Sequence, residues 1–180
     1  MENQWALHPS TTVAKRWISD TDIYYPCDDP RIKPQWEVGC WMNQASLMYN
    51  VHFHGDIRKT SDACLAVKDP TYQQTCFNNL ARQLHPLTNG QLIPAIRMCD
   101  QFDPTWQDYC LTSIAVSDFA NGGRDLAYKI CPVMEDEHKP DCYDQLFGTM
   151  LGYSTSRADM ELSCAPITDN AYRLQCLNTK

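Results

Sequence analysis

The sequence predicts an all-α protein, an α-solenoid of about five antiparallel helical hairpins with one disulfide in each hairpin. The first observation is that ten cysteines fall into five evenly spaced pairs, with 10 to 12 residues between partners. The second is that the pairs recur about every 34 residues, the length of one helical hairpin in a repeat protein. The third is that helix-start signals, aromatic rings and small residues recur in register with the cysteines. The pairs are Cys27 with Cys40, Cys64 with Cys76, Cys99 with Cys110, Cys131 with Cys142, and Cys164 with Cys176.

A helix-start signal lies between the two cysteines of each pair. Seven positions before the second cysteine stands an acidic residue in four of the repeats, and a proline takes the next position in three. Aspartate accepts hydrogen bonds from the free N–H groups of a first helical turn, and proline at the first helical position loses no hydrogen bond. The second helix of each hairpin is therefore predicted to begin there. The two columns are Lys33, Asp69, Asp103, Glu135 and Asp169, followed by Pro34, Pro70, Pro104, Asp136 and Asn170.

An aromatic ring occurs four positions before the second cysteine in every repeat. We expect this ring, the cysteine and the apolar residue after it to share one face of the second helix. The first cysteine is expected about one turn before the end of the first helix. An antiparallel hairpin then brings the two cysteines together, so we predict a disulfide within each pair and a ring packed beside it. The ring column is Trp36, Tyr72, Trp106, His138 and Tyr172, and the column after the second cysteine is Trp41, Phe77, Leu111, Tyr143 and Leu177.

Small residues mark the expected packing positions and turns. Alanines five positions past the second cysteine favour close helix contact, and glycines nine positions before a first cysteine favour a turn. These residues are Ala45, Ala81 and Ala115, then Gly55, Gly90 and Gly122, with Gly152 in a shifted position in the fourth repeat. We expect helices near residues 10–20, 34–48, 57–67, 70–84, 91–102, 104–119, 123–133, 139–150, 155–166 and 169–178. The chain is predicted to form a single domain, 1–180, with an N-terminal cap (1–26) and repeats at approximately 27–54, 55–89, 90–121, 122–153 and 154–180.

Composition limits the compartment and the class of partner. An even number of regularly paired cysteines indicates an oxidising compartment, so the protein is expected to be secreted or periplasmic. Residues 1–26 contain no apolar stretch typical of a signal peptide, so we expect either a leader already removed or entry by a route without one. The net charge is −7 without a lysine or arginine run, which argues against a nucleic-acid partner. No apolar segment reaches the roughly 18–20 residues of a transmembrane helix.

Few residues suggest chemistry. His52 and His54, in the loop before Gly55, are the candidate metal ligands, for copper, nickel or zinc, if the segment is extended; two solvent-facing histidines are the simpler interpretation. His138 is interpreted as a packing ring, since it lies in the aromatic column. The chain has no C-x2-C, no G-x-S-x-G and no phosphate-binding glycine loop, so no catalytic residue and no cofactor are predicted. The acidic groups are expected to cap helices or face solvent.

Two families share parts of this pattern. Paired helices of about 34 residues with small residues at packing positions resemble tetratricopeptide-type solenoids over residues 27–180, above all the cysteine-rich secreted kind that closes each hairpin with one disulfide. The tetratricopeptide signature of Trp, Gly, Tyr and Ala is not matched in register, so this resemblance assigns no binding residue. The chain also resembles twin C-x9-C proteins of the mitochondrial intermembrane space. Those proteins carry both cysteines of a pair on one helix and join different helices by disulfides.

The sequence therefore favours a non-enzymatic repeat protein. Its predicted role is a protein-binding or structural component of an extracellular or envelope assembly, because solenoids offer extended binding surfaces. The aromatic residues of the N-terminal 26 residues are interpreted either as a contact patch or as a cap over the first hairpin. The alternatives are a metal-handling protein that uses His52 and His54, and an accessory subunit of a mitochondrial complex.

Overall fold

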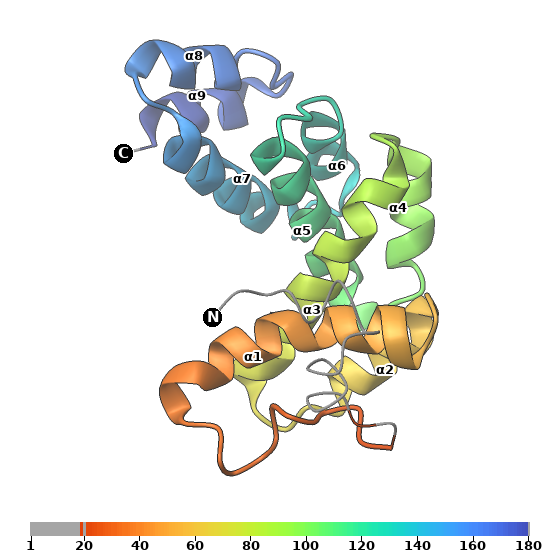
Figure 1. Cartoon of the computed structure of the whole chain (residues 1–180). Coiled ribbons are helices and arrows are strands. Elements are labelled where there is room, and N and C mark those ends of the chain that lie inside the picture. The colour runs from red at the N-terminus through yellow and green to blue at the C-terminus, as the bar shows by residue number, and fades with distance from the viewer. Residues whose placement is uncertain (1–18, 20, 180) are drawn as a thin grey trace.

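The computed structural model describes residue 19 and residues 21–179, and the predicted all-α fold is confirmed for them. Figure 1 shows the helical hairpins following one another along an elongated molecule, from α1 and α2 at one end to α8 and α9 at the other. The helix predicted near residues 10–20 falls outside the described residues, apart from Ser19, which is not helical. The nine α-helices of the described residues are α1 (Pro34–Leu47), α2 (Ile57–Leu65), α3 (Pro70–Leu84), α4 (Leu92–Cys99), α5 (Gln107–Ala120), α6 (Ala127–Val133), α7 (Lys139–Tyr153), α8 (Arg157–Cys164) and α9 (Asn170–Asn178).

The helix-start column caps helices where it contains aspartate. The Asp69 carboxylate accepts hydrogen bonds from the N–H groups of Thr71 (2.8 Å) and Tyr72 (3.3 Å), and Asp169 makes the equivalent pair at the start of α9. Asp103 accepts from the N–H two residues on at 3.0 Å, in a short 3-10 turn that leads into α5. These contacts satisfy N–H groups that a helix start otherwise leaves without a partner.

The first and fourth repeats begin their second helix differently. Lys33 makes no side-chain cap, and α1 begins directly after it with proline in its first turn. In the fourth repeat the chain first turns at Glu135, whose carbonyl accepts from the N–H groups of His138 (2.9 Å) and Lys139 (3.1 Å). The helix α7 therefore begins at Lys139, with Pro140 in its first turn. This start agrees with the predicted helix 139–150.

The second helices form the continuous row of the solenoid. Helices α1, α3, α5 and α7 pack against one another in chain order. Ala45, Ala81 and Ala115 are fully buried (0% exposed), which agrees with their predicted role at close helix contacts. The first helices α2, α4, α6 and α8 have only 7 to 9 residues and contact the second helix of their own hairpin. Among the described residues no helix is long and apolar enough to cross a membrane.

Three of the four marked glycines are at left-handed turns. Gly55, Gly90 and Gly122 have φ angles of 87°, 68° and 82°, a conformation that costs glycine little and other residues more. Gly152 differs, because α7 continues through it to Tyr153.

All five predicted disulfides are present, with Cα–Cα distances of 5.5 to 5.9 Å. They join Cys27 with Cys40, Cys64 with Cys76, Cys99 with Cys110, Cys131 with Cys142, and Cys164 with Cys176.

The cysteines differ slightly from their expected places on the helices. In the last four hairpins the first cysteine lies in the last turn of the first helix, later than predicted. The second cysteine lies on the second helix in every hairpin, as expected; these residues are Cys40 on α1, Cys76 on α3, Cys110 on α5, Cys142 on α7 and Cys176 on α9. Cys27 is the exception among the first cysteines, since it lies in a turn where its N–H donates to the Tyr24 carbonyl at 2.7 Å. No pair has both cysteines on one helix, so the arrangement implied by the twin C-x9-C resemblance is not found.

Candidate functional site

The aromatic column makes contacts between successive hairpins. In three repeats the ring stacks on the side chain that follows the second cysteine of the preceding hairpin, and we call this row of contacts the ladder. The planes of each pair lie within 20° of one another, a stacked arrangement that adds to simple area burial. The stacked pairs are Trp41–Tyr72 (5.8 Å between ring centroids, 13° between planes), Phe77–Trp106 (4.2 Å, 13°) and Tyr143–Tyr172 (3.9 Å, 20°).

The prediction that the ring and the residue after the cysteine share a helix face is wrong. These two positions are five residues apart, and five residues at about 100° each separate them by about 140° around a helix. One side chain therefore points to the preceding hairpin and the other to the following hairpin. On α3, for example, Tyr72 stacks on α1 while Phe77 stacks on Trp106 of the next hairpin.

Polar contacts hold the ladder in register. The Tyr72 hydroxyl donates a hydrogen bond to the Glu37 carboxylate on α1, and this bond raises the pKa of Tyr72 to about 12. Burial raises the pKa of Tyr143 to about 12 as well. Both phenols therefore stay protonated at neutral pH. At the last junction the Gln175 amide donates to the Asp144 carboxylate at 2.6 Å, joining α9 to α7.

His138 occupies the ring position at the junction between the third and fourth repeats. Its Nε2 atom lies 3.3 Å from Asp108 Oδ2 on α5 and 3.3 Å from Glu137 Oε1. Ligand atoms of Glu135, Glu137 and His138 all lie within 4.8 Å of one another. The interpretation of His138 as a packing ring alone is therefore incomplete: the imidazole joins carboxylates of two hairpins, a donor set suited to zinc.

The structure places the predicted ligands His52 and His54 in a different setting from the extended segment that shared coordination needs. His52 ends a π-helical turn (Met48–His52) and is partly buried, whereas His54 is exposed with a φ angle of 50°. Neither belongs to the group of three potential metal ligands found among the described residues. Metal binding by this pair stays a prediction.

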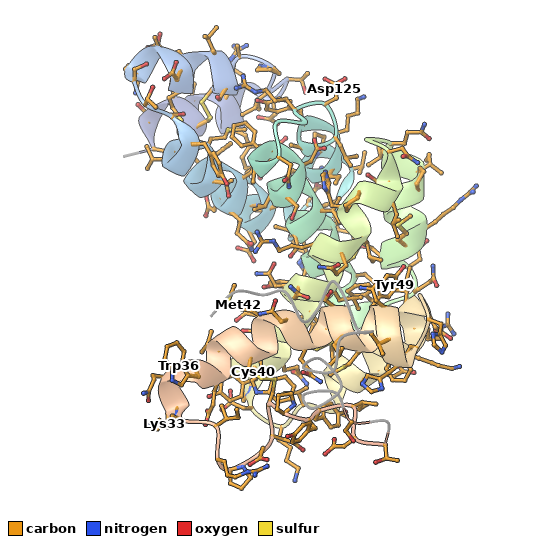
Figure 2. The ribbon with its side chains drawn as sticks, viewed as in Figure 1. Lys33, Trp36, Cys40, Met42, Tyr49 and Asp125 are labelled. Carbon is orange, nitrogen blue, oxygen red and sulfur yellow. A yellow bond between two sulfur atoms is a disulfide. The ribbon has the colours of Figure 1, made fainter. Side chains whose placement is uncertain are left out.

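At each end of the described chain, one ladder position has no stacking partner among the described residues. Trp36 is the ring of the first repeat, and no ring of the described residues stacks on it; its side chain is 56% exposed. Figure 2 shows Trp36 at the outer end of α1. At the opposite end, Leu177 takes the position of Trp41, and no hairpin of the described residues follows it. Leu177 borders a hollow of about 370 Å³ on α8 and α9, lined also by Arg157, Glu161, Cys164, Ala165 and Arg173.

A second hollow, of about 260 Å³, lies between the end of α5, the end of α7 and α8. Its charged side chains are engaged in contacts of the protein itself. The Arg124 guanidinium lies 5.6 Å from the centre of the Phe119 ring, and the Asp159 carboxylate accepts from the Thr155 N–H at 3.1 Å.

A buried polar contact that the sequence did not reveal joins three segments. Asp118 on α5 is 4% exposed; its Oδ1 atom lies 3.1 Å from His85 Nε2, and its Oδ2 atom accepts from the Ala127 N–H at 3.0 Å. A Cβ atom on Gly123 would lie 2.5 Å from Asp118 Oδ1, so glycine is needed there. His85 and Ala127 lie 33 and 9 positions from Asp118 along the chain, with no repeat column to connect them. The contact stabilises the loop before α6.

Comparisons of the chain with protein-family models, with curated proteins and with solved structures found no match. The resemblance to tetratricopeptide-type solenoids thus rests on period and helix content, and the structure adds helical hairpins linked by disulfides.

Proposed function

We propose that this protein is a non-enzymatic, disulfide-stabilised helical repeat that binds another protein and serves as a structural component of a larger extracellular or envelope assembly. The observation that carries the proposal is the exposure of Trp36 at the end of the ladder. Tyr72, Trp106 and Tyr172, its counterparts in other repeats, are partly buried against the core. An exposed tryptophan in a column where three of the other rings are packed marks a contact surface.

Trp36 has the features of a binding residue, and the helix that carries it has another exposed apolar side chain. Met42, about 120° around α1 from Trp36, is 46% exposed. Tryptophan is enriched among the residues that contribute most to protein–protein binding, and methionine is also enriched at such interfaces. The helix that carries them is held by the Cys27–Cys40 disulfide and by the ladder, so little conformational freedom is lost on binding.

The five disulfides support a location outside the reducing cytosol, with secretion or the periplasm as the proposed compartments. The mitochondrial intermembrane space is the alternative, and it has less support because the disulfides join cysteines within each pair.

Site-specific photo-crosslinking in the native compartment tests this function. A photoreactive phenylalanine analogue replaces Trp36 in one variant and Leu65, a 40% exposed residue on α2, in the matched control. We expect crosslinks to a polypeptide from position 36 and not from position 65. Absence of crosslinks from position 36, or equal crosslinking from both positions, would overturn the proposal.

The second candidate function is metal handling, and the group around His138 favours it over the pair His52 and His54. Calorimetric titration with Zn²⁺ and Cu²⁺ compares the wild type, His138→Ala, and a double variant that combines His52→Ala with His54→Ala. Loss of binding in His138→Ala alone would support the group at the third junction, and loss in the double variant would support the loop. No binding by the wild type above a weak surface background would remove this candidate.

A further inference from the structure

We propose that copies of this protein bind one another head to tail, with Trp36 of one copy stacked on Leu177 of the next. The inference rests on the proposed protein-binding function and names the partner at Trp36 as a second copy of the chain. We define the head as Trp36 with the outer face of α1, and the tail as Leu177 with the hollow between α8 and α9.

The first argument is continuity with the junctions inside the chain. Each stacked junction pairs a ring with the side chain after a second cysteine, and three of the four junctions contain such a pair of rings. We call the side chain after the second cysteine the platform. Among the described residues, no platform stacks on the ring at the head, and no ring stacks on the platform at the tail. A second copy would bring a platform to the head and a ring to the tail, in the register already used within the molecule.

Leucine occupies the platform position at the third junction as well. There the platform column contains Leu111, which packs against the core, and the ring column contains His138. The His138 ring is held at this junction by its contact with Asp108, 3.3 Å away. Leu177 at the tail is the same residue type at the same position.

The second argument is chemical complementarity between Trp36 and the tail. In the first repeat, the position three before the second cysteine is Glu37, which receives the hydroxyl of the incoming ring Tyr72. In the last repeat this position is Arg173, which lines the hollow beside Leu177. An arginine beside an incoming tryptophan suits a cation–π contact, for which tryptophan is the best ring. Arg157 donates to the Leu177 carbonyl and so fixes the platform.

The outer face of α1 is open to a neighbouring helix. Gly39 lies on this face, near Trp36, and a Cβ atom built on it would have no other atom within 4 Å. In α3 the equivalent position is Thr75, on the side of the helix that carries Tyr72. Glycine at the head therefore leaves room for close approach of α9 from another copy.

The two surfaces lie at opposite ends of the molecule, as Figure 1 shows for α1 and for α8 with α9. A contact between two different surfaces of identical chains is heterologous, so it continues into an open chain of copies or closes into a ring. Self-association should therefore extend beyond a dimer.

Sedimentation velocity of the oxidised protein, over micromolar to millimolar concentrations, tests the proposal. We expect the wild type to form a concentration-dependent series of oligomers. Trp36→Ala and Leu177→Asp should each weaken association about 30-fold or more, the effect typical of truncating a dominant interface residue. Arg173→Glu provides a second change at the tail if Leu177→Asp alters the melting temperature.

A mixture of two single variants separates head-to-tail contact from other modes. Trp36→Ala keeps an intact tail and Leu177→Asp keeps an intact head, so an equimolar mixture should form dimers and nothing larger. The matched controls are Val38→Ala and Leu162→Ala, which change exposed side chains (46% and 66%) on α1 and α8. Val38 lies about 160° around α1 from Trp36, and Leu162 lines the other hollow. Both controls should associate as the wild type does.

A wild type that stays monomeric throughout, or a mixture that stays monomeric, would overturn head-to-tail association. In that case a crosslink from position 36 to a different protein would still support the proposed function. Absence of both self-association and crosslinks would overturn the two together.

Discussion

The two rows of helices in this solenoid are stabilised by different means. The second helices α1, α3, α5 and α7 have 14 or 15 residues and are joined by the alanine column and the ladder. The first helices have only 7 to 9 residues, below the length at which an isolated helix is stable. Each is tied to its partner by a disulfide in its last turn. The second row is thus a packed core, and the first row depends on covalent links.

This difference explains why every hairpin carries a disulfide. A hairpin with one short helix buries too little apolar surface to hold both helices by packing alone. Placing the link in the last turn of the short helix closes a small loop and restricts the unfolded chain. The predictions below test this division between the rows, from the largest expected effect to the smallest.

Truncation within the second row should have the largest effect. Phe77 is fully buried and stacks on Trp106, so Phe77→Ala is expected to lower the free energy of unfolding by about 3–5 kcal/mol. The matched control is Trp36→Ala at the exposed end of the same ladder, expected to cost less than about 0.5 kcal/mol in the monomer. Urea unfolding followed by circular dichroism measures both. Equal losses would show that the ladder does not form the core of the second row.

Removal of one disulfide should loosen the first row selectively. A double variant that combines Cys131→Ala with Cys142→Ala opens a link between residues 11 apart and should cost about 3 kcal/mol. Both α6 and α7 contact α5, but α6 has 7 residues and α7 has 15, so α6 is expected to lose more protection from hydrogen exchange than α7. Retained protection in α6 would contradict the dependence of the first row on covalent links.

The Asp118 contact is one of the polar links between the rows. Asp118→Ala leaves the Ala127 N–H and the His85 ring without this partner and should cost about 2 kcal/mol. Asp125→Ala, which changes an exposed acid of the same loop labelled in Figure 2, serves as the control and should change stability little. Thermal unfolding of both variants measures this difference. Similar melting temperatures would show that the Asp118 contact does not stabilise the protein.

Capping contributes less than packing, and it depends on local geometry. Asp69→Ala removes an acceptor for two N–H groups of α3 and should cost about 1 kcal/mol. Glu135 occupies the same column but precedes α7 by four residues, so Glu135→Ala should have almost no effect on unfolding. A loss of similar size in both variants would mean that the column acts through charge instead of through the cap.

The smallest effect concerns alkaline pH. Burial raises the pKa of Tyr143 from its usual 10.0 to about 12, so the folded state holds this proton more tightly than the unfolded state. The resulting stability is fully present below pH 10 and is lost as the pH rises toward 12. Tyr143→Phe should therefore lose less stability than the wild type over this range, as measured by melting temperature.

The control for this experiment is Tyr153→Phe, which changes a tyrosine that is 63% exposed. It should follow the wild type at every pH. If the melting temperature of Tyr143→Phe falls with pH as steeply as that of the wild type, the buried phenol does not contribute to alkaline unfolding.

Much of the fold could be predicted because each repeat carries its own local signals. Asp69 followed by Pro70 marks the start of α3, and Gly90 marks the turn before α4. The ladder could not be derived in the same way, although both of its columns were recognised. Its partners, such as Phe77 and Trp106, come from different hairpins, and only the stacking of hairpins brings them together. The exposure of Trp36 follows from this stacking, since the tryptophan has a column but no preceding hairpin among the described residues.

The sequence by itself determined the helical class, the repeat and most helix starts, and its period favoured the five disulfide pairs. These features depend on residues within one repeat, where spacing along the chain sets spacing in space. Only the tertiary structure decided which way each ring faces, that His138 meets Asp108, and that Asp118 is buried against His85. Those contacts join residues of different hairpins, and their geometry is set by the packing angle between helices, which no local pattern specifies.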